Sequence, residues 1–201
     1  MATKFIDYIQ QLHAVSDKET ALIAAFFEER SFKEGDYLFE PNHICKTFFF
    51  ICSGVLRIVR HNDNGVEVTH NFLREKQFCT ILNSFTNEVI AEEAIQASSN
   101  ATVMAIEKNK LLELYQQLPW LGPLIDQITQ QALIDKIQLR NSYLGLDSAE
   151  RYERFLTQQP EVAAQVSLGD IASYLGITRQ SLSRIRRQIS VQSSSSPRRE
   201  P

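Results

Sequence analysis

The spacing of hydrophobic residues changes twice along the chain and divides it into three regions. Residues 3–30 have helical spacing, and within them Ser16 and Glu19 form the pattern of a capping box at the start of a helix. Residues 31–106 carry short apolar runs separated by turn residues, whereas helical spacing returns from Lys108 onward. The pattern predicts a helical N-terminal segment, a β-rich region and a helical C-terminal half.

The β-rich region has the spacing of a barrel or jelly roll. Its apolar runs lie at 37–39, 48–51, 55–59, 66–73 and 101–106. Short strands at intervals of about 8–12 residues are typical of such folds. Asn64-Gly65 stands between two of the runs and predicts a hairpin turn, because both residues tolerate positive φ.

The helical half begins with a short helix that ends before Pro119 and continues with a long one over Leu121–Leu146. Four apolar residues of the long helix recur every seven positions: Ile125, Ala132, Leu139 and Leu146. This spacing predicts a coiled-coil seam through which two copies pair, although Asp135 interrupts the second seam position. The alternative is a core helix that packs on its own domain.

Two further helical segments follow the long helix. Asp147 to Gln159 predicts one short helix, and Val166 to Ile189 predicts a compact helical pair. Residues 192–201 include four consecutive serines, and we expect this tail to be disordered.

Residues 168–187 carry the strongest functional signal. Five apolar positions fit a small core shared by two helices: Ile171, Leu175, Ile177, Leu182 and Ile185. Ala172 permits a close helix crossing, Gly176 suits a turn that needs positive φ, and Thr178 can cap the second helix. This arrangement predicts a helix-turn-helix, whose second helix suits the major groove of DNA.

The outward face of that second helix has the chemistry of a DNA-reading surface. It comprises Arg179, Gln180, Ser183, Arg184 and Arg187. Arginine can bridge O6 and N7 of guanine and glutamine can pair with adenine, while the hydroxyls of Thr178 and Ser181 suit phosphates. The alternative is an ordinary helical hairpin with a solvated basic face.

The charge of the whole chain hides this local basic surface. With 21 Lys and Arg against 24 Asp and Glu, the net charge is −3, which excludes a generally basic nucleic-acid binder. Residues 147–201 hold eight Arg and six acidic residues, a net +2, so residues 1–146 carry −5. DNA contacts are therefore expected only at the second helix.

Composition excludes other classes of protein. No apolar run approaches the roughly 20 residues of a membrane span, and no secretory signal is present, so we expect a cytoplasmic protein. Cys45, Cys52 and Cys79 form no disulfide framework and are too few for an iron–sulfur sensor. The histidines show no metal spacing, and no catalytic motif is present, so we expect neither an enzyme nor a cofactor.

The order of these regions, together with two motifs, resembles the Crp/Fnr transcription regulators. The motif Phe32-x-x-Gly35-Asp36-x-Leu38-Phe39, with the run Phe48 to Arg57, is similar to the opening strands of the cyclic-nucleotide-binding fold. The segment Thr178 to Arg184 is similar to the recognition helix of the family. By that resemblance, the base-reading candidates are Arg179, Gln180, Ser183 and Arg184.

The resemblance implies an α+β fold. It has an N-terminal jelly roll (a double-stranded β-helix) of the cyclic-nucleotide-binding kind, a long dimerisation helix, and a helix-turn-helix of winged-helix type. The sequence departs from the family after the recognition helix, since residues 190–201 show no strand pattern, and we expect the wing to be missing. The expected boundaries are 1–118 for the sensor domain, 119–146 for the dimerisation helix, 147–191 for the DNA-binding domain and 192–201 for the tail. The implied partners are double-stranded DNA, a second copy of the chain through residues 121–146, and RNA polymerase.

The ligand motif of that family is altered here. Cyclic-nucleotide-binding members have Phe-Gly-Glu before a short helix and a later Pro-Arg-Ser-Ala, whose Arg neutralises the cyclic phosphate. In this chain no Gly-Glu follows Phe78, and Glu92-Glu93 stands where Arg-Ser would be. Carboxylates repel a phosphate, so we expect no response to cAMP.

Another ligand could occupy the roll. The candidate pocket residues, which could equally cap a structural helix, are Cys79, Thr80, Asn83 and Ser84. We therefore expect a sequence-specific DNA-binding regulator of the Crp/Fnr type. The alternative is a protein that binds a cyclic nucleotide or another small ligand and whose DNA-binding module is vestigial.

Overall fold

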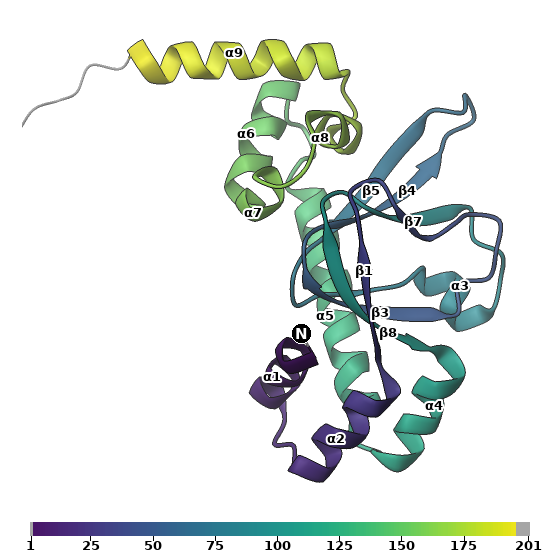
Figure 1. Cartoon of the computed structure of the whole chain (residues 1–201). Coiled ribbons are helices and arrows are strands. Elements are labelled where there is room, and N and C mark those ends of the chain that lie inside the picture. The colour runs from purple at the N-terminus through teal and green to yellow at the C-terminus, as the bar shows by residue number, and fades with distance from the viewer. Residues whose placement is uncertain (1, 196–201) are drawn as a thin grey trace, which may run out of the picture.

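The computed structural model describes residues 2–195 of the chain, with side chains described for residues 4–189. A roll of two antiparallel sheets lies against the long helix α5 (Leu121–Asn141), and the C-terminal helices follow at the far end of α5 (Figure 1). No described helix is both long and apolar enough to cross a membrane.

Each sheet of the roll has four strands. The first sheet runs, in spatial order, β1 (Glu28–Phe32), β8 (Ala101–Glu107), β3 (Thr47–Ser53) and β6 (Phe78–Cys79). The second runs β2 (Tyr37–Phe39), β7 (Glu93–Ala97), β4 (Leu56–His61) and β5 (Glu67–Leu73). The predicted α+β fold with an antiparallel β-roll and C-terminal helices is confirmed.

Strand β3 is buried on both faces, which explains its unbroken run of apolar residues. Phe49 and Ile51 point into the roll, in a cluster with residues of both sheets. Phe48 and Phe50 point the other way, toward the helices, and the ring of Phe50 lies 4.8 Å from that of Phe5. The strand therefore joins the core of the roll to the core under the helices.

Gly54 forms a corner of the roll that no other residue could form without a backbone shift. Its φ is +83°, and a Cβ atom placed there would overlap the carbonyl oxygen of Asn100. This corner brings the start of β4 against the turn before β8.

The N-terminal region is helical over a shorter range than the spacing predicts. It forms α1 (Ala2–Leu12) and α2 (Asp17–Phe26), and β1 begins at Glu28, so the prediction of a helix to residue 30 is wrong. Pairing of β1 with β8 takes these last residues into the sheet. The capping box is confirmed, because the Ser16 hydroxyl accepts from the Glu19 amide and the Glu19 carboxylate accepts from the Ser16 amide at 2.9 Å.

Glu19 also ties α2 to the start of α5. The indole Nε1 of Trp120 donates to Glu19 Oε1 at 2.9 Å. Hydrogen bonds from Ser16, and then from Trp120, lower the pKa of Glu19 to about 2.

The Glu19→Gln variant should lower the melting temperature at neutral pH. The Glu19 carboxylate stabilises the fold above its ordinary pKa of 4.5, and this contribution is lost as the pH falls toward about 2. The difference in melting temperature between variant and parent should therefore shrink over that interval in thermal melts. A difference that stays constant with pH would contradict this role.

The long helix ends earlier than predicted. After α4 (Lys108–Gln117), which ends before Pro119 as expected, α5 stops at Asn141 rather than at residue 146. The hydroxyl of Ser142 donates to the carbonyl of Leu139 at 2.7 Å, and Gly145 has a φ of +76°, which breaks the helix.

The C-terminal helices are α6 (Ser148–Gln158), α7 (Pro160–Ala163), α8 (Leu168–Leu175) and α9 (Arg179–Ser195), and α3 (Leu82–Asn87) lies in the roll. The predicted helix over 147–159 and helical pair over 166–189 are confirmed. Residues 192–195 continue α9, where a disordered tail was expected. The rest of that tail, 196–201, lies outside the described residues.

Candidate functional site

Helices α8 and α9 meet at a turn whose hydrogen bonds fix the start of α9. Gly176 adopts a φ of +68° at the end of α8, as the sequence predicts. The hydroxyl of Thr178 accepts a hydrogen bond from the Ser181 amide at 3.1 Å, which caps the first turn of α9. The amide of Ile177 donates to the carbonyl of Ala172 at 3.0 Å and closes the turn.

A small apolar core sets the angle between the two helices. Its fully buried members include Phe155 of α6, Ala172 of α8 and Leu182 of α9. Four of the five predicted core positions are buried, and Ile177 is partly buried against the same cluster. This core turns one face of α9 inward and leaves the opposite face to solvent.

The solvent face of α9 brings together six of the seven predicted site residues. They line one shallow concave surface: Thr178, Arg179, Gln180, Ser183, Arg184 and Arg187. No acidic residue in the described chain lines it. The seventh, Ser181, does not line this surface but lies next to it, with its hydroxyl 2.9 Å from that of Thr178. Three guanidinium groups beside an amide on one helix face form a donor-rich surface of the kind that reads guanine and adenine edges.

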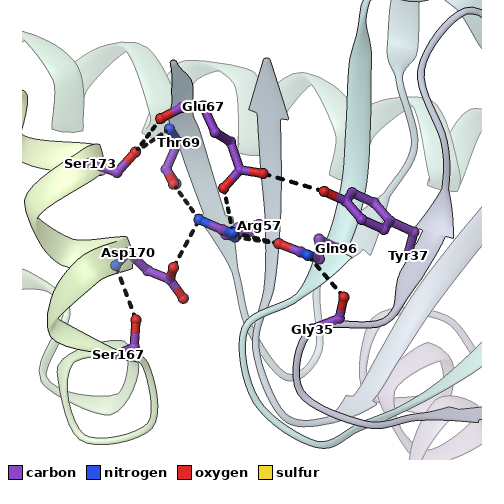
Figure 2. A network of polar contacts seen from close by, with 9 residues as sticks. All are labelled: Gly35, Tyr37, Arg57, Glu67, Thr69, Gln96, Ser167, Asp170 and Ser173. Carbon is purple, nitrogen blue, oxygen red and sulfur yellow. Dashed lines mark hydrogen bonds and ion pairs between the residues drawn. The ribbon is translucent and has the colours of Figure 1, made fainter. Parts of the chain in front are cut away.

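A buried arginine of the roll holds the C-terminal helices in place. Arg57 of β4 is only 8% exposed. Its Nη1 lies 2.8 Å from Asp170 Oδ1 of α8, and its Nη2 lies 2.6 Å from Glu67 Oε1 of β5 (Figure 2). Its Nε donates to Gln96 Oε1 at 2.9 Å, so the guanidinium group is bonded on every side. Burial raises the pKa of Asp170, and the charge of Arg57 opposes this effect.

Two other contacts accompany the arginine. The hydroxyl of Ser173 in α8 accepts from the Thr69 amide at 2.9 Å and donates to the Glu67 carbonyl at 3.2 Å (Figure 2). The ring of Phe72 in β5 lies 5.2 Å from that of Tyr174. The helix-turn-helix is thus joined to the roll by a polar network beside an aromatic contact. The sequence gives little sign of this network, because its partners lie about a hundred positions apart.

A second concave site lies between the roll and α5. It has a volume of about 660 Å³. Of the four predicted pocket residues, Thr80 and Asn83 line it, whereas Cys79 and Ser84 are buried behind its wall. The hydroxyl of Ser84 has a structural role, because it accepts from the Cys45 amide at 2.8 Å and donates to the Val89 carbonyl at 2.6 Å.

The charges at this cavity differ in part from those expected. Glu93 lines it, but Glu92 points to solvent and pairs with Arg60. Lys76 and Lys136 also line the cavity. Lys136 was missed because it lies on α5, more than 40 positions from the family motif, and only the fold brings it there.

The three cysteines lie in the core. Cys45, Cys52 and Cys79 are buried free thiols, and burial raises the pKa of Cys79. Within the described part of the chain, no group of three or more His, Cys, Asp or Glu residues is placed to hold a metal ion.

Known proteins share this fold. The family model of the cyclic nucleotide-binding domain matches residues 29–118. No curated protein matches the chain in sequence. A solved structure of a putative Crp/Fnr-family transcriptional regulator from Eubacterium rectale is 18% identical, with a TM-score of 0.70 over 92% of this chain and 88% of that one. The c-di-GMP-responsive global regulator CLP of Xanthomonas campestris is 17% identical, with a TM-score of 0.69 over 89% and 93%.

FixK2 from Bradyrhizobium japonicum is also similar, at 16% identity and a TM-score of 0.70 over 83% of this chain and 86% of that one. At such identities the likeness is one of fold. Residues 29–118 therefore match the model of the cyclic nucleotide-binding domain, and the chain as a whole shares its fold with structural neighbours that include Crp/Fnr regulators.

Proposed function

We propose that the chain is a sequence-specific DNA-binding transcription regulator of the Crp/Fnr type. The observation that supports it most is the solvent face of α9, where Arg179, Arg184 and Arg187 line one surface with Gln180. Regulators with the same fold among the structural neighbours also support a regulatory rather than an enzymatic role. Thr178, Ser181 and Ser183 would contribute hydroxyls to phosphates and bases.

We propose that two copies of the chain pair, because one recognition helix makes few DNA contacts and a dimer reads two half-sites. α5 exposes Ile134 (47%) and Ile137 (58%), neither of which lines the cavity between the roll and α5. Ile134 and Ile137 are three positions apart on α5, which is the spacing of neighbouring positions in a pairing seam. Ile125, the first residue of the expected seam, is instead buried in the chain's own core, so the proposed seam uses a different face of the helix.

The test of DNA reading is selection from a pool of random duplexes by the intact protein. We expect enrichment of a two-fold symmetric site, with half-sites about one helical turn, roughly 10 base pairs, or a multiple of it, apart. The alternative, a small-ligand-binding protein with a vestigial DNA-binding module, predicts no enrichment of any sequence. Failure to enrich a sequence would therefore overturn the proposal.

The Ile137→Asp variant should be monomeric. A charge placed on each side of the seam would lose its water on pairing, and the two charges would repel each other. Sedimentation equilibrium should show a dimer for the parent and a monomer for the variant. Ile90→Asp, at a position 66% exposed in the roll, is the matched control and should remain dimeric. A parent that is monomeric at every concentration would contradict the seam.

We also propose that the protein does not respond to cAMP. The Glu93 carboxylate lines the cavity, and among the described residues no arginine lines it to hold a cyclic phosphate. In a thermal-shift assay, cAMP at millimolar concentration should leave the melting temperature unchanged, since only a ligand that binds the folded state raises it. A clear stabilisation at micromolar cAMP would contradict this proposal.

A further inference from the structure

A further cleft of about 400 Å³ lies where the roll, α5 and the C-terminal helices meet. It adjoins the cavity between the roll and α5, with which it shares His70, Asn71 and Lys136. β5 contributes His70, α5 contributes Lys136 and Arg140, and α6 contributes Arg151. Within the described residues, no Asp or Glu lines this cleft. It is therefore a concentration of positive charge in a protein whose net charge is −3.

The two cations of α5 have no partner that would account for their position. Lys136 and Arg140 are one helical turn apart, and like charges at this spacing weaken a helix. Neither forms an ion pair with any residue in the part of the chain that the structure describes. An anion in the cleft would turn this repulsion into attraction.

The other two basic groups of the cleft are Arg151 and His70. Arg151 Nη1 donates to the carbonyl of Leu175 at 3.0 Å, which fixes the guanidinium group at the C-terminal end of α8. Partial burial lowers the pKa of His70; Glu93 opposes this, while the charges of Lys136, Arg60 and Arg140 add to it.

Aromatic rings form another part of the cleft wall. Tyr143 and Tyr174 both line it, with ring centroids 6.0 Å apart and planes nearly perpendicular. Gln159 Nε2 donates to both hydroxyls, at 3.3 and 3.4 Å, which fixes the orientation of the rings. Rings of fixed orientation beside arginines provide both a surface for a flat base and donors for phosphate oxygens.

We propose that this cleft binds a nucleotide that carries a terminal phosphate or diphosphate group. The phosphates lie against Lys136, Arg140 and Arg151, and the base lies against the tyrosines. The volume of the cleft is within the range of small-molecule sites. cAMP carries a single negative charge and gains least from three cations, so this site is consistent with a protein that does not respond to it.

Calorimetric titration of the full chain tests this site directly, without reference to DNA. The probes are ADP, pyrophosphate, adenosine and cAMP. We expect ADP to bind, pyrophosphate to bind more weakly, and adenosine and cAMP to bind at least tenfold more weakly than ADP. In Lys136→Gln/Arg140→Gln, the affinity for ADP should fall at least tenfold.

The matched control is Lys18→Gln/Arg30→Gln, which also removes one lysine and one arginine, from α2 and β1 outside the cleft, and should bind ADP as the parent does. Thermal melts check that both variants are folded. The site is refuted if ADP does not bind at millimolar concentration, if adenosine binds equally well, or if both double variants behave alike. Equal affinity of the parent for pyrophosphate and ADP would rule out a nucleotide as the ligand. If Lys136→Gln/Arg140→Gln loses affinity for a short DNA duplex but not for ADP, the cleft binds the DNA backbone instead.

Discussion

Arg179→Ala/Arg184→Ala is expected to abolish selective DNA binding. Both guanidinium groups lie on the solvent face of α9, next to Gln180, on a surface without acidic neighbours among the described residues. A bidentate contact from arginine to guanine contributes about 1–3 kcal/mol of discrimination, so losing two costs about 2–6 kcal/mol per half-site, or roughly thirty-fold or more in affinity. Titration of the selected duplex against a scrambled one, at fixed salt, measures the loss.

The control separates base reading from overall charge. Arg30→Ala/Arg60→Ala removes two positive charges as well, but from exposed ion pairs with Glu28 and Glu92 in the roll. This variant should keep its preference for the selected site. If both double variants lose the same affinity for specific and scrambled DNA, the arginines of α9 act only through charge, and base reading by α9 is refuted.

Arg57→Ala should destabilise the protein more than the loss of any other arginine that is paired in the structure. Its removal leaves the carboxylates of Asp170 and Glu67, both largely buried, without their counter-charge at the junction between the roll and α8. Breaking a buried pair by removing one partner costs about 3–5 kcal/mol. Urea denaturation, followed by circular dichroism, should show this decrease in the free energy of unfolding.

Arg60→Ala is the matched control for this change, since both arginines lie on β4 and both pair with glutamate. The Arg60 side chain is 47% exposed, and exposed pairs contribute about 0–1 kcal/mol. Equal effects of the two substitutions would mean that Arg57 does not hold the helices on the roll.

Elements set by contiguous sequence could be predicted, and those set by distant contacts could not. The helix-turn-helix depends on about twenty adjacent residues, and the strand runs depend on their own apolar spacing. The helix predicted to residue 30 fails because β8, some seventy positions away, takes Glu28 into a sheet. Local spacing also favours a pairing seam through Ile125. In the structure, Ile125 is instead buried in the core that includes residues of α1, α2 and α4.

The same limit applies to the sites. The basic face of α9 is local, and its six residues are found together. The role of Arg57 is not local, since nothing in the neighbouring sequence indicates that Asp170 lies beside it. Likewise, Lys136 lines both the cavity between the roll and α5 and the cleft beside the C-terminal helices, because α5 runs past the two sites.

The hydroxyl of Ser173 has a consequence beyond holding two domains together. β5 is the last strand of its sheet, with β4 as its partner on one side, so its other side offers backbone groups to any incoming strand. Ser173 occupies two of these groups, the Thr69 amide and the Glu67 carbonyl, and α8 covers the strand beside them. Helix α8 therefore protects the roll from strand-to-strand association: a roll that loses α8 would expose β5 and tend to aggregate through it.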